Sequence, residues 1–284
     1  MTLAGTANYT VTNADITTLT VSSTGTAAIT TQDLGVDDAG AIVISGGGNA
    51  TVTGGGSGDT LTITGLATAG QTFTGTVSKF NVTGGLLGQA ITTGGAVDTI
   101  DGGAGNDTIT GGAGADGLTG GLGADVFVFS GSTTALNGAD TIADFAVAQG
   151  DVLSFASVLT SGAIANATVG TAITLASTGA LATEGTSIAV ATNKVYVAQV
   201  TTAATIDTAG KVITALTDTG VLDAVDFAAS AHSILILSGA DALTTFYVYG
   251  IDNDGTAAIA GGELVLIGIA TADTVTLLTT SFGF

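Results

Sequence analysis

Aspartate recurs at a fixed interval in the middle of the chain. It stands at every ninth position over four steps, and an apolar residue follows two places after each, giving the pairs Asp98 and Ile100, Asp107 and Ile109, Asp116 and Leu118, and Asp125 and Phe127. Glycines precede every one of these aspartates, and glycine lets the backbone turn through positive φ and bring its carbonyls close to an ion. A carboxylate is the kind of hard anionic oxygen that Ca²⁺ prefers. The pattern therefore predicts calcium sites built from aspartate side chains and loop carbonyls.

The interval belongs to an internal repeat, whose copies are GGAVDTID at 94–101 (a shorter copy), GGAGNDTIT at 102–110, GGAGADGLT at 111–119 and GGLGADVFV at 120–128. We expect each copy to join a glycine-rich turn to a short strand whose apolar residue points into a core. If one coil takes two copies, Asp98 stacks on Asp116 and Asp107 on Asp125. Stacked carboxylates on one edge of a solenoid repel each other unless a cation lies between them.

The copies match the nonapeptide G-G-x-G-x-D-x-U-x, with U apolar, and in these residues the chain resembles the RTX (repeats-in-toxin) family of calcium-binding β-rolls. The segment that follows, with GADVFVFS, GADTIADF and GDVLSF, is similar to the cap after the β-roll in serralysin-type proteases. The resemblance implies Ca²⁺ between successive loops on one side of the roll. The copy at 94–101 departs from it by lacking the fourth-position glycine. Carried over to this sequence, the implied ligands are Asp98, Gly103, Gly105, Asp107, Gly112, Gly114, Asp116, Gly121, Gly123 and Asp125, with Asp140 and Asp144 in the cap.

Strand-like segments lie on both sides of the repeat. Residues 1–93 are rich in Thr, Gly and Ala, and short alternations such as TLTVS (18–22) and TLTIT (60–64) predict β-strands. After the repeat, runs such as SILILSG (233–239) and TFYVYGI (245–251) predict more strands. The chain has 45 glycines and no proline, which suits a protein made largely of sheet because proline removes ladder donors.

These patterns predict an all-β chain: a parallel β-solenoid that runs into a calcium β-roll, followed by a β-rich carboxy-terminal domain. The expected divisions are a Thr/Gly-rich solenoid over 1–93, the roll and its cap over 94–155, and an assembly or secretion domain over 156–284. Within the last of these, 208–217 and 221–231 are candidates for short helices.

Composition narrows the choice of partners. The chain carries 23 acidic residues against three lysines and no arginine, for a formal net charge of −20. This excludes nucleic acid and anionic membrane surfaces, both of which need a basic patch. Only 9% of residues are charged, against roughly 25% in ordinary soluble domains. So little charge favours a protein that covers its surface with further copies of itself, that is, a homo-oligomer. The chain has no cysteine and so no disulfide, and bound metal is another way to stabilise an extracellular protein.

The route out of the cell is predicted by the resemblance. The amino terminus shows no secretory signal peptide, which leaves a cytoplasmic protein, another export route or trimming before this numbering begins. The uncharged run from 152 to 183 is broken by Ser, Thr, Asn and Gly, so we do not expect a transmembrane segment. The RTX resemblance implies type I secretion through an uncleaved carboxy-terminal signal, with which the apolar end TVTLLTTSFGF is compatible. The expected location is extracellular, at the bacterial cell surface.

Two weaker signals lie outside the repeat. The segment 251–263 resembles an EF-hand loop through Asp252 and Asp254, but Glu263 arrives two residues late, so an acidic turn is favoured over a second calcium site. His232 is the only histidine, and the chain contains neither an H-E-x-x-H zinc motif nor a G-x-S-x-G nucleophile elbow. An enzyme is therefore the least favoured class.

Two other functions remain in competition. The first is a structural subunit that self-assembles into a bacterial surface layer (S-layer) or extracellular filament, which the low charge, the many strands and the calcium switch favour. The second is an RTX adhesin or biofilm-matrix protein that binds a cell-surface glycan or another surface.

Overall fold

The structure is a computed structural model, and it describes residues 2–6, 8–14, 18–31, 39–45, 47–53, 60–66, 68–130, 137–155, 178–180, 188–190, 195–199, 225–227, 232–238, 245–252, 264–273 and 282–283. The chain divides into two compact units, one formed by Met1–Val128 with Asp140–Val152 and the other by Phe129–Ala139 with Leu153–Phe284. Each unit is described by itself.

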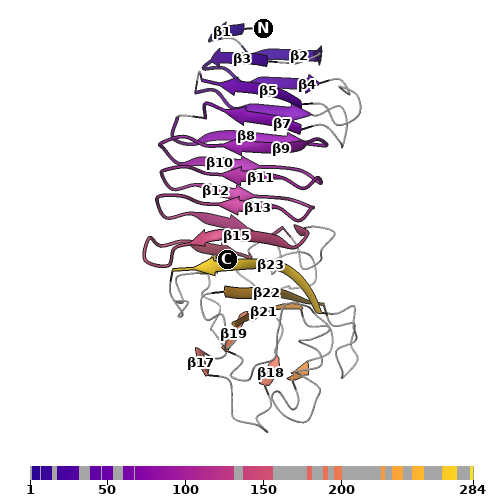
Figure 1. Cartoon of the computed structure of the whole chain (residues 1–284), viewed down its shortest axis with the longest axis vertical. Helices are drawn as coiled ribbons and strands as arrows, with labels where there is room; N and C mark the ends of the chain where they lie inside the picture. The colour runs from indigo at the N-terminus through magenta and orange to yellow at the C-terminus, as the bar shows by residue number, and fades with distance from the viewer. Residues whose placement is uncertain are drawn as a thin grey trace. The chain divides into compact units, whose positions relative to one another are not determined.

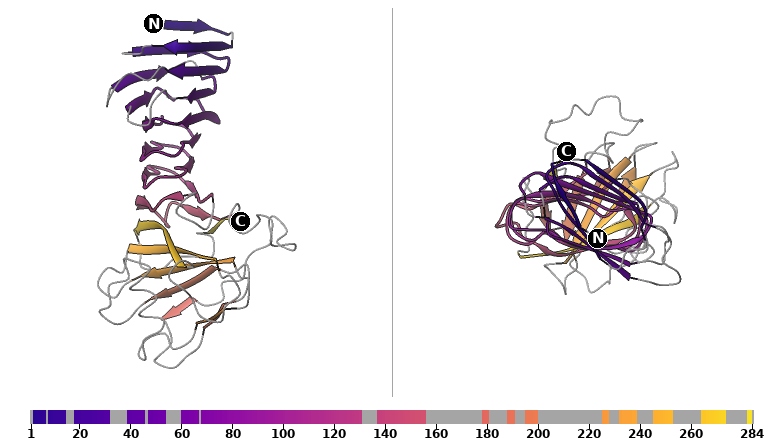
Figure 2. Two further views of the ribbon diagram at one scale, coloured as in Figure 1. Left: turned by 90° about the vertical axis from the view of Figure 1, so that its right-hand side faces the viewer. Right: turned by 90° about the horizontal axis from the view of Figure 1, so that it is seen from above.

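The first unit is a parallel β-solenoid whose strands alternate between two sheets (Figure 1). One sheet has the order β1 (Thr2–Gly5), β3 (Thr18–Ser23), β5 (Ala39–Ile44), β7 (Thr60–Thr64), β9 (Lys79–Thr83), β11 (Thr99–Asp101), β13 (Gly117–Thr119) and β15 (Asp140–Phe145). The other has the order β2 (Tyr9–Ala14), β4 (Ala27–Thr31), β6 (Ala50–Thr53), β8 (Gln71–Thr76), β10 (Gln89–Thr92), β12 (Thr108–Thr110) and β14 (Val126–Val128). Seen from above, the coils lie over one another as flattened rings (Figure 2).

The register of these strands fixes the length of a coil. Thr99 pairs with Asn81 on one side and with Gly117 on the other, and hydrogen bonds between equivalent repeat residues join positions 18 apart. One coil therefore takes two nonapeptides, as the sequence predicts. The first coil has the same length, since Thr2 pairs with Thr20, whereas the coils that follow it are longer, as the pairing of Ala27 with Ala50 shows.

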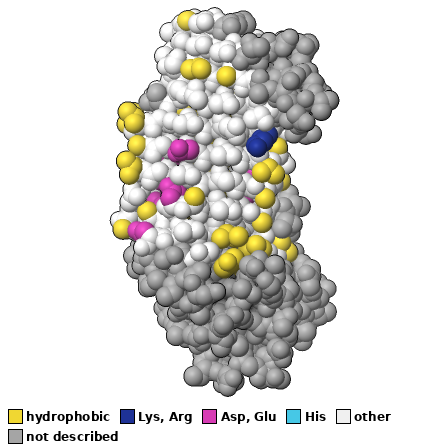
Figure 3. All heavy atoms as spheres, in the orientation of Figure 1, with side chains coloured by type: hydrophobic (Ala, Val, Ile, Leu, Met, Phe, Trp, Pro, Cys, Tyr) yellow, Lys and Arg dark blue, Asp and Glu magenta, His cyan; other side chains and the backbone are white. Residues whose placement is uncertain are grey.

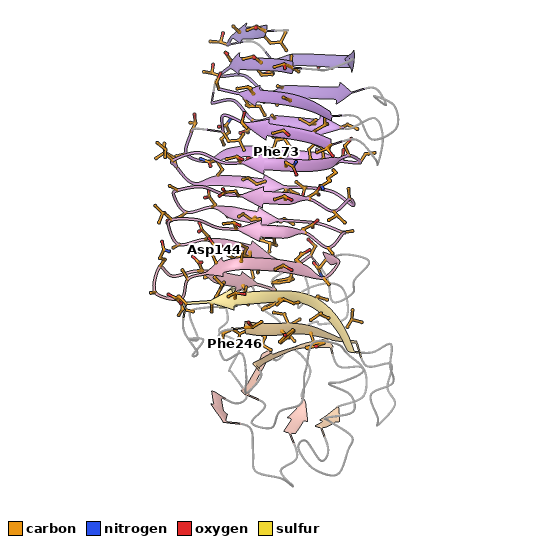
Figure 4. The ribbon with its side chains drawn as sticks, in the orientation of Figure 1. Phe73, Asp144 and Phe246 are labelled. Atoms are coloured by element: carbon orange, nitrogen blue, oxygen red, sulfur yellow. The ribbon has the colours of Figure 1, made fainter. Side chains whose placement is uncertain are left out.

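The core of the solenoid is a ladder of apolar side chains at every ninth residue. All of its members are between 0 and 3% exposed: Phe73, Val82, Ile91, Ile100, Ile109, Leu118 and Phe127. Flanking residues on each strand are exposed or half-buried, so the strands are apolar inward and polar outward. Phe73 also meets Phe80 edge to face, with ring centroids 5.7 Å apart, inside the coil (Figure 4). The inward-pointing apolar residue of each repeat is therefore confirmed, and the ladder begins upstream of the repeat itself.

The second unit is also built from strands. Its described strands are β17 (Thr178–Ala180), β18 (Ile188–Val190), β19 (Val195–Gln199), β20 (Val225–Phe227), β21 (His232–Ser238), β22 (Thr245–Asp252), β23 (Leu264–Ala272) and β24 (Phe282–Gly283), together with β16 (Val152–Ser154), which begins at the last residue of the first unit. β22 pairs antiparallel with both β21 and β23, while β24 pairs parallel with β16. Phe246 (Figure 4), Val248 and Tyr249 on β22 are buried at 2% exposure or less.

The all-β class and the parallel solenoid are thus confirmed. The helix considered for 221–231 is wrong where the structure describes that segment, because residues 225–227 form β20 and pair in parallel with β18. The helix considered for 208–217 lies outside the described residues, as does all of 251–263 after Asp252. In the described part of the chain, no helix is long and apolar enough to cross a membrane.

The apolar ladder generates a stability prediction. Ile109→Ala removes a fully buried side chain between two coils, and it should lower the free energy of unfolding in calcium by about 2–5 kcal/mol. The matched control is Thr108→Ala on the exposed side of the same strand, which should change it by about 0.5 kcal/mol or less. Urea unfolding followed by circular dichroism gives both values. Equal effects of the two variants would contradict the inward ladder.

Candidate metal centre

Glycines at the second and fourth positions of each complete repeat form the turns. Their φ angles lie in the left-handed region that favours glycine, as at Gly112 (90°) and Gly114 (125°). The corresponding residues of the neighbouring repeats behave alike: Gly103, Gly105, Gly121 and Gly123. These six are the glycines that the resemblance assigns to the loops, and their conformation explains why other residues are excluded there.

The first glycine of each repeat is needed for a different reason. Gly102 has no left-handed φ, but a Cβ atom on it would lie 2.7 Å from Oδ2 of Asp107 and 2.7 Å from the carbonyl oxygen of Gly120 in the next coil. Gly111 and Gly120 likewise face Oδ2 of the aspartate in their own repeat. Each loop therefore brings carboxylate oxygen, and at Gly102 a carbonyl oxygen as well, to a space that a side chain would fill.

The repeat aspartates form two columns, one at each turn of the solenoid. The backbone N–H of Asp98 donates to Oδ1 of Asp116 over 2.8 Å, and that of Asp107 donates to Oδ1 of Asp125 over 2.8 Å. The predicted stacking is confirmed. All four side chains are at most 1% exposed. The carboxylates are therefore buried between the coils whose N–H groups they bind.

The second oxygen of each aspartate is left without a hydrogen bond. Oδ2 is buried and has no partner in Asp98, Asp107, Asp116 and Asp125. A buried anionic oxygen without a partner costs several kcal/mol, so such atoms in a stable protein face a cation or carry a proton. Four equivalent oxygens in the same state, one in each repeat, indicate a repeated binding site.

The cap continues both columns with irregular spacing. Asp140 accepts the N–H of Asp116 over 3.0 Å, and Asp151 accepts the N–H of Asp125 over 2.9 Å. Asp144, at the end of β15 (Figure 4), does not join a column: its two oxygens accept the N–H groups of Gly120 and Gly121 over 2.9 and 2.8 Å. Sequence reasoning missed Asp151, although the G-D-V-L around it repeats the apolar pattern of the last full copy.

The copy at 94–101 begins one residue earlier than its glycine pair suggests. Ala113, the third residue of its repeat, donates its N–H to the carbonyl of Gly94. Gly94 is therefore the second residue of its loop, Thr93 is the first and Ala96 the fourth. The Thr93 hydroxyl donates to the carbonyl of Gly111 over 2.7 Å. The fourth position of this copy, where the other repeats have glycine, is therefore Ala96. The loop still places Asp98 in the same column as Asp116.

The donors available for a metal are oxygens of two kinds. Among the described residues, no group of three His, Cys, Asp or Glu side chains gathers at one point, so a site made only of side chains is not present there. A buried carboxylate oxygen next to backbone carbonyls is instead a hard, all-oxygen donor set, which suits Ca²⁺. The residues present therefore fit calcium.

Comparison with known protein families agrees with this chemistry. The family model for the RTX calcium-binding nonapeptide repeat matches residues 92–127, in four copies. The chain carries RTX calcium-binding repeats. RTX nonapeptides bind Ca²⁺, which confirms the predicted cofactor, and proteins that carry them are generally secreted. Neither the curated proteins nor the solved structures gave a match to the chain.

Burial controls the ionisation of the RTX aspartates. Desolvation raises the pKa of Asp107 to about 7 and that of Asp151 to about 6, although backbone N–H donors oppose the rise in both. Burial also raises the pKa of Asp98 and of Asp125. Asp116 and Asp140 lie against each other, and burial raises the pKa of both. Burial therefore shifts the aspartates of both columns toward the neutral form, relative to an exposed aspartate, when no cation faces them.

A pH dependence without calcium follows from these shifts. The folded-state pKa values of Asp107 and Asp151 lie above the ordinary 3.8, so protonation stabilises the folded roll. This contribution is complete below about pH 4 and is lost as the pH rises through the folded-state values between 6 and 7. Decalcified protein, in buffers passed over chelating resin, should show more β-signal by circular dichroism at pH 5 than at pH 8. A signal that falls on acidification would contradict the assignment.

Proposed function

We propose that this RTX-type protein is a structural subunit of the bacterial exterior, in which calcium orders the solenoid and the ordered copies then assemble into a surface layer or filament. The observation that carries the calcium part is the set of four buried, unpartnered Oδ2 atoms. The uncharged outer face of one solenoid sheet supports the assembly part. The proposal assigns no catalysis, since the sequence contains one histidine and no cysteine.

The proposed ligands are the column aspartates and the carbonyls of the glycine loops. Each unpartnered Oδ2 marks one candidate ion, so the described repeats offer four positions. The proposed set comprises Asp98, Asp107, Asp116 and Asp125 with loop residues Gly103, Gly105, Gly112, Gly114, Gly121 and Gly123, and with Asp140 and Asp144 in the cap. Asp151 joins the set because it continues the column of Asp125.

Calcium would act as a folding switch. Where calcium is scarce, the aspartates of each column must lose either their charge or their stacking, because burial disfavours the bare carboxylates. Outside the cell, calcium near the affinity range of extracellular modules, about 10⁻⁴–10⁻³ M, occupies the sites. Because the sites exist only in the folded roll, the binding free energy becomes folding free energy.

One sheet of the solenoid offers a surface for packing copies together. Thr51, Thr74, Thr92 and Thr110 lie in register on the outward side of the sheet that contains β8 and β10. The outward residues of β6, β8, β10, β12 and β14 include no charged side chain. The opposite sheet carries Lys79 and Asp101 on its outward side, and charged groups appear on the solenoid surface in Figure 3. The threonine-lined sheet is therefore the one that can be covered without burying charge.

A second candidate function, adhesion, is favoured by a different feature. The third loop positions Leu86, Ala104 and Leu122 stack on one side of the solenoid, through the hydrogen bonds Ala104 N–H to Gly85 and Leu122 N–H to Gly103. Leu86 is 81% and Leu122 68% exposed. Exposed apolar ridges are typical of contact surfaces, so an adhesin or matrix protein that binds glycans or other surfaces remains the alternative.

The ligand assignment is tested with isosteric variants. Asp116→Asn keeps an oxygen for the N–H of Asp98 but removes the anionic Oδ2. It should weaken calcium binding in isothermal titration calorimetry by about tenfold or more, because ligand charge sets calcium affinity over decades. Asp273→Asn, at an exposed position outside the repeats, is the control and should titrate as the wild type does. Equal titrations for the two variants would show that the columns are not the site.

The assembly proposal is tested by placing charge on each sheet in turn. Calcium should cause the wild type to sediment as large species that chelator disperses, because four ions would reduce the net charge from −20 to about −12 and order the face. The pair Thr74→Lys with Thr92→Lys should stay monomeric in calcium with an unchanged β-signal. The matched pair on the opposite sheet, Thr62→Lys with Asn81→Lys, should still assemble. Analytical ultracentrifugation measures all three.

A wild type that stays monomeric at every calcium concentration would contradict self-assembly and transfer the proposal to adhesion. Assembly that persists in the Thr74 and Thr92 variant but is lost in the Thr62 and Asn81 variant would place the interface on the other sheet and overturn the one proposed.

A further inference from the structure

The column that contains Asp107 and Asp125 continues toward the amino terminus with a different chemistry. The N–H of Gln89 donates to Oδ1 of Asp107 over 2.6 Å, as the N–H of Asp107 does to the next aspartate. Gln89 in turn pairs with Gln71 one coil earlier. Both glutamines are buried, at 3 and 2% exposure. The same position in the coil is therefore a carboxylate in the RTX repeats and a neutral amide before them.

The sequence around Gln89 shows that it occupies the aspartate position of a degenerate copy of the repeat. Residues 84–92 read GGLLGQAIT, with glycines at the first two positions, Gln in place of Asp, and Ile91 as the inward apolar residue. A Cβ atom on Gly84 would lie 2.9 Å from Oε1 of Gln89, just as one on Gly102 would meet Oδ2 of Asp107. Oε1 of Gln89 therefore occupies the place that Oδ2 of Asp107 occupies one coil later.

The amides complete their loops without an ion. Oε1 of Gln89 accepts the N–H of Gly85 over 3.0 Å, whereas Oδ2 of Asp107 has no hydrogen-bond partner. Nε2 of Gln71 donates to the carbonyl of Gly48 over 2.8 Å, so a side-chain N–H binds a loop carbonyl there. Nε2 of Gln89 is the one amide atom left buried without a partner among the described residues, and it is uncharged.

The column position itself is uncharged in the coils before the repeats, because Gln71 and Gln89 stand there. The aspartates of residues 1–93 lie outside the described residues. The core of these coils is well filled, because Ile42, Leu61 and Phe80 are fully buried. Nothing described in these coils needs a cation to offset it.

We propose that Gln89 marks a boundary of calcium dependence within one continuous solenoid. The coils before it stay folded without calcium. Their last N–H groups, those of Phe80 and Gln89, are then already in place to donate to Asp98 and Asp107 when calcium binds. In these coils the side-chain amides of Gln71 and Gln89 make the loop contacts that an ion would make in the repeats. The inference rests on the proposed calcium binding of the repeats, and it adds that the chain carries its own metal-free template for them.

The test is hydrogen–deuterium exchange of the full chain, followed by mass spectrometry, in chelator and in millimolar calcium. In the wild type, peptides from 68–92 should be protected in both conditions. Peptides from 98–128 should gain about tenfold protection or more with calcium, since local stability sets the exchange rate.

Gln89→Glu exchanges the amide for a carboxylate of the same shape and should make peptides from 79–92 calcium-dependent as well. Asn81→Asp makes the same exchange on the outward side of β9 and should leave the wild-type pattern unchanged.

The possible outcomes separate the boundary at Gln89 from calcium binding by the repeats. Loss of protection over 68–92 together with the repeats in chelator, or no effect of Gln89→Glu, overturns the boundary while leaving calcium binding intact. Full protection of 98–128 in chelator overturns calcium-dependent folding itself. A change in Asn81→Asp equal to that in Gln89→Glu would show that added charge, and not the column position, is responsible.

Discussion

The structure depends on how each repeat aspartate uses its two oxygens. Oδ1 accepts the N–H of the equivalent residue one coil earlier, at 2.8 Å between Asp98 and Asp116, and so fixes the stacking of the coils. The same bond holds Oδ2 inside the turn, where it has no hydrogen-bond partner. The carboxylate that sets the register therefore creates a buried charge, and only a cation or a proton removes its cost. The glycine turns and the inward apolar ladder serve this arrangement by letting coils approach closely enough for the bond to form.

Because of this constraint, we expect the folding of the repeats to depend on the calcium around the protein. A solenoid held only by apolar ladders and backbone bonds would fold wherever it was made, and the coils with Gln71 and Gln89 have that character. Coils with aspartate in the same column need a counter-charge, so we propose that their folding follows the calcium concentration. The threonine-lined outer sheet is uncharged over β6 to β14, so ordering these coils extends a surface that copies can share. In this account, secretion, folding and assembly are linked through the charge state of one column position.

Much of the site was predictable because the nine-residue interval carries the geometry. Two nonapeptides per coil place Asp98 over Asp116, and glycines at fixed places predict the left-handed turns. Burial of the carboxylates was not predictable, since aspartate is normally exposed and the bonds from N–H groups of the neighbouring coil are seen only in the structure. Asp151 was missed because the cap lengthens its separation from Asp125 to 26 residues. Gln89 was missed because its copy lacks the aspartate that identifies the repeat, although the ninefold apolar ladder that reaches back to Phe73 includes Ile91 in the same copy.

The central claim is that calcium binds at the unpartnered oxygens of the buried columns. Anomalous diffraction from crystals grown in calcium, collected at a wavelength where calcium scatters anomalously, locates the ions without reference to any assumed ligand. The account predicts peaks within coordination distance, about 2.3–2.6 Å, of Oδ2 in Asp98, Asp107, Asp116 and Asp125. Peaks confined to the exposed Asp101, with none beside the columns, would contradict it.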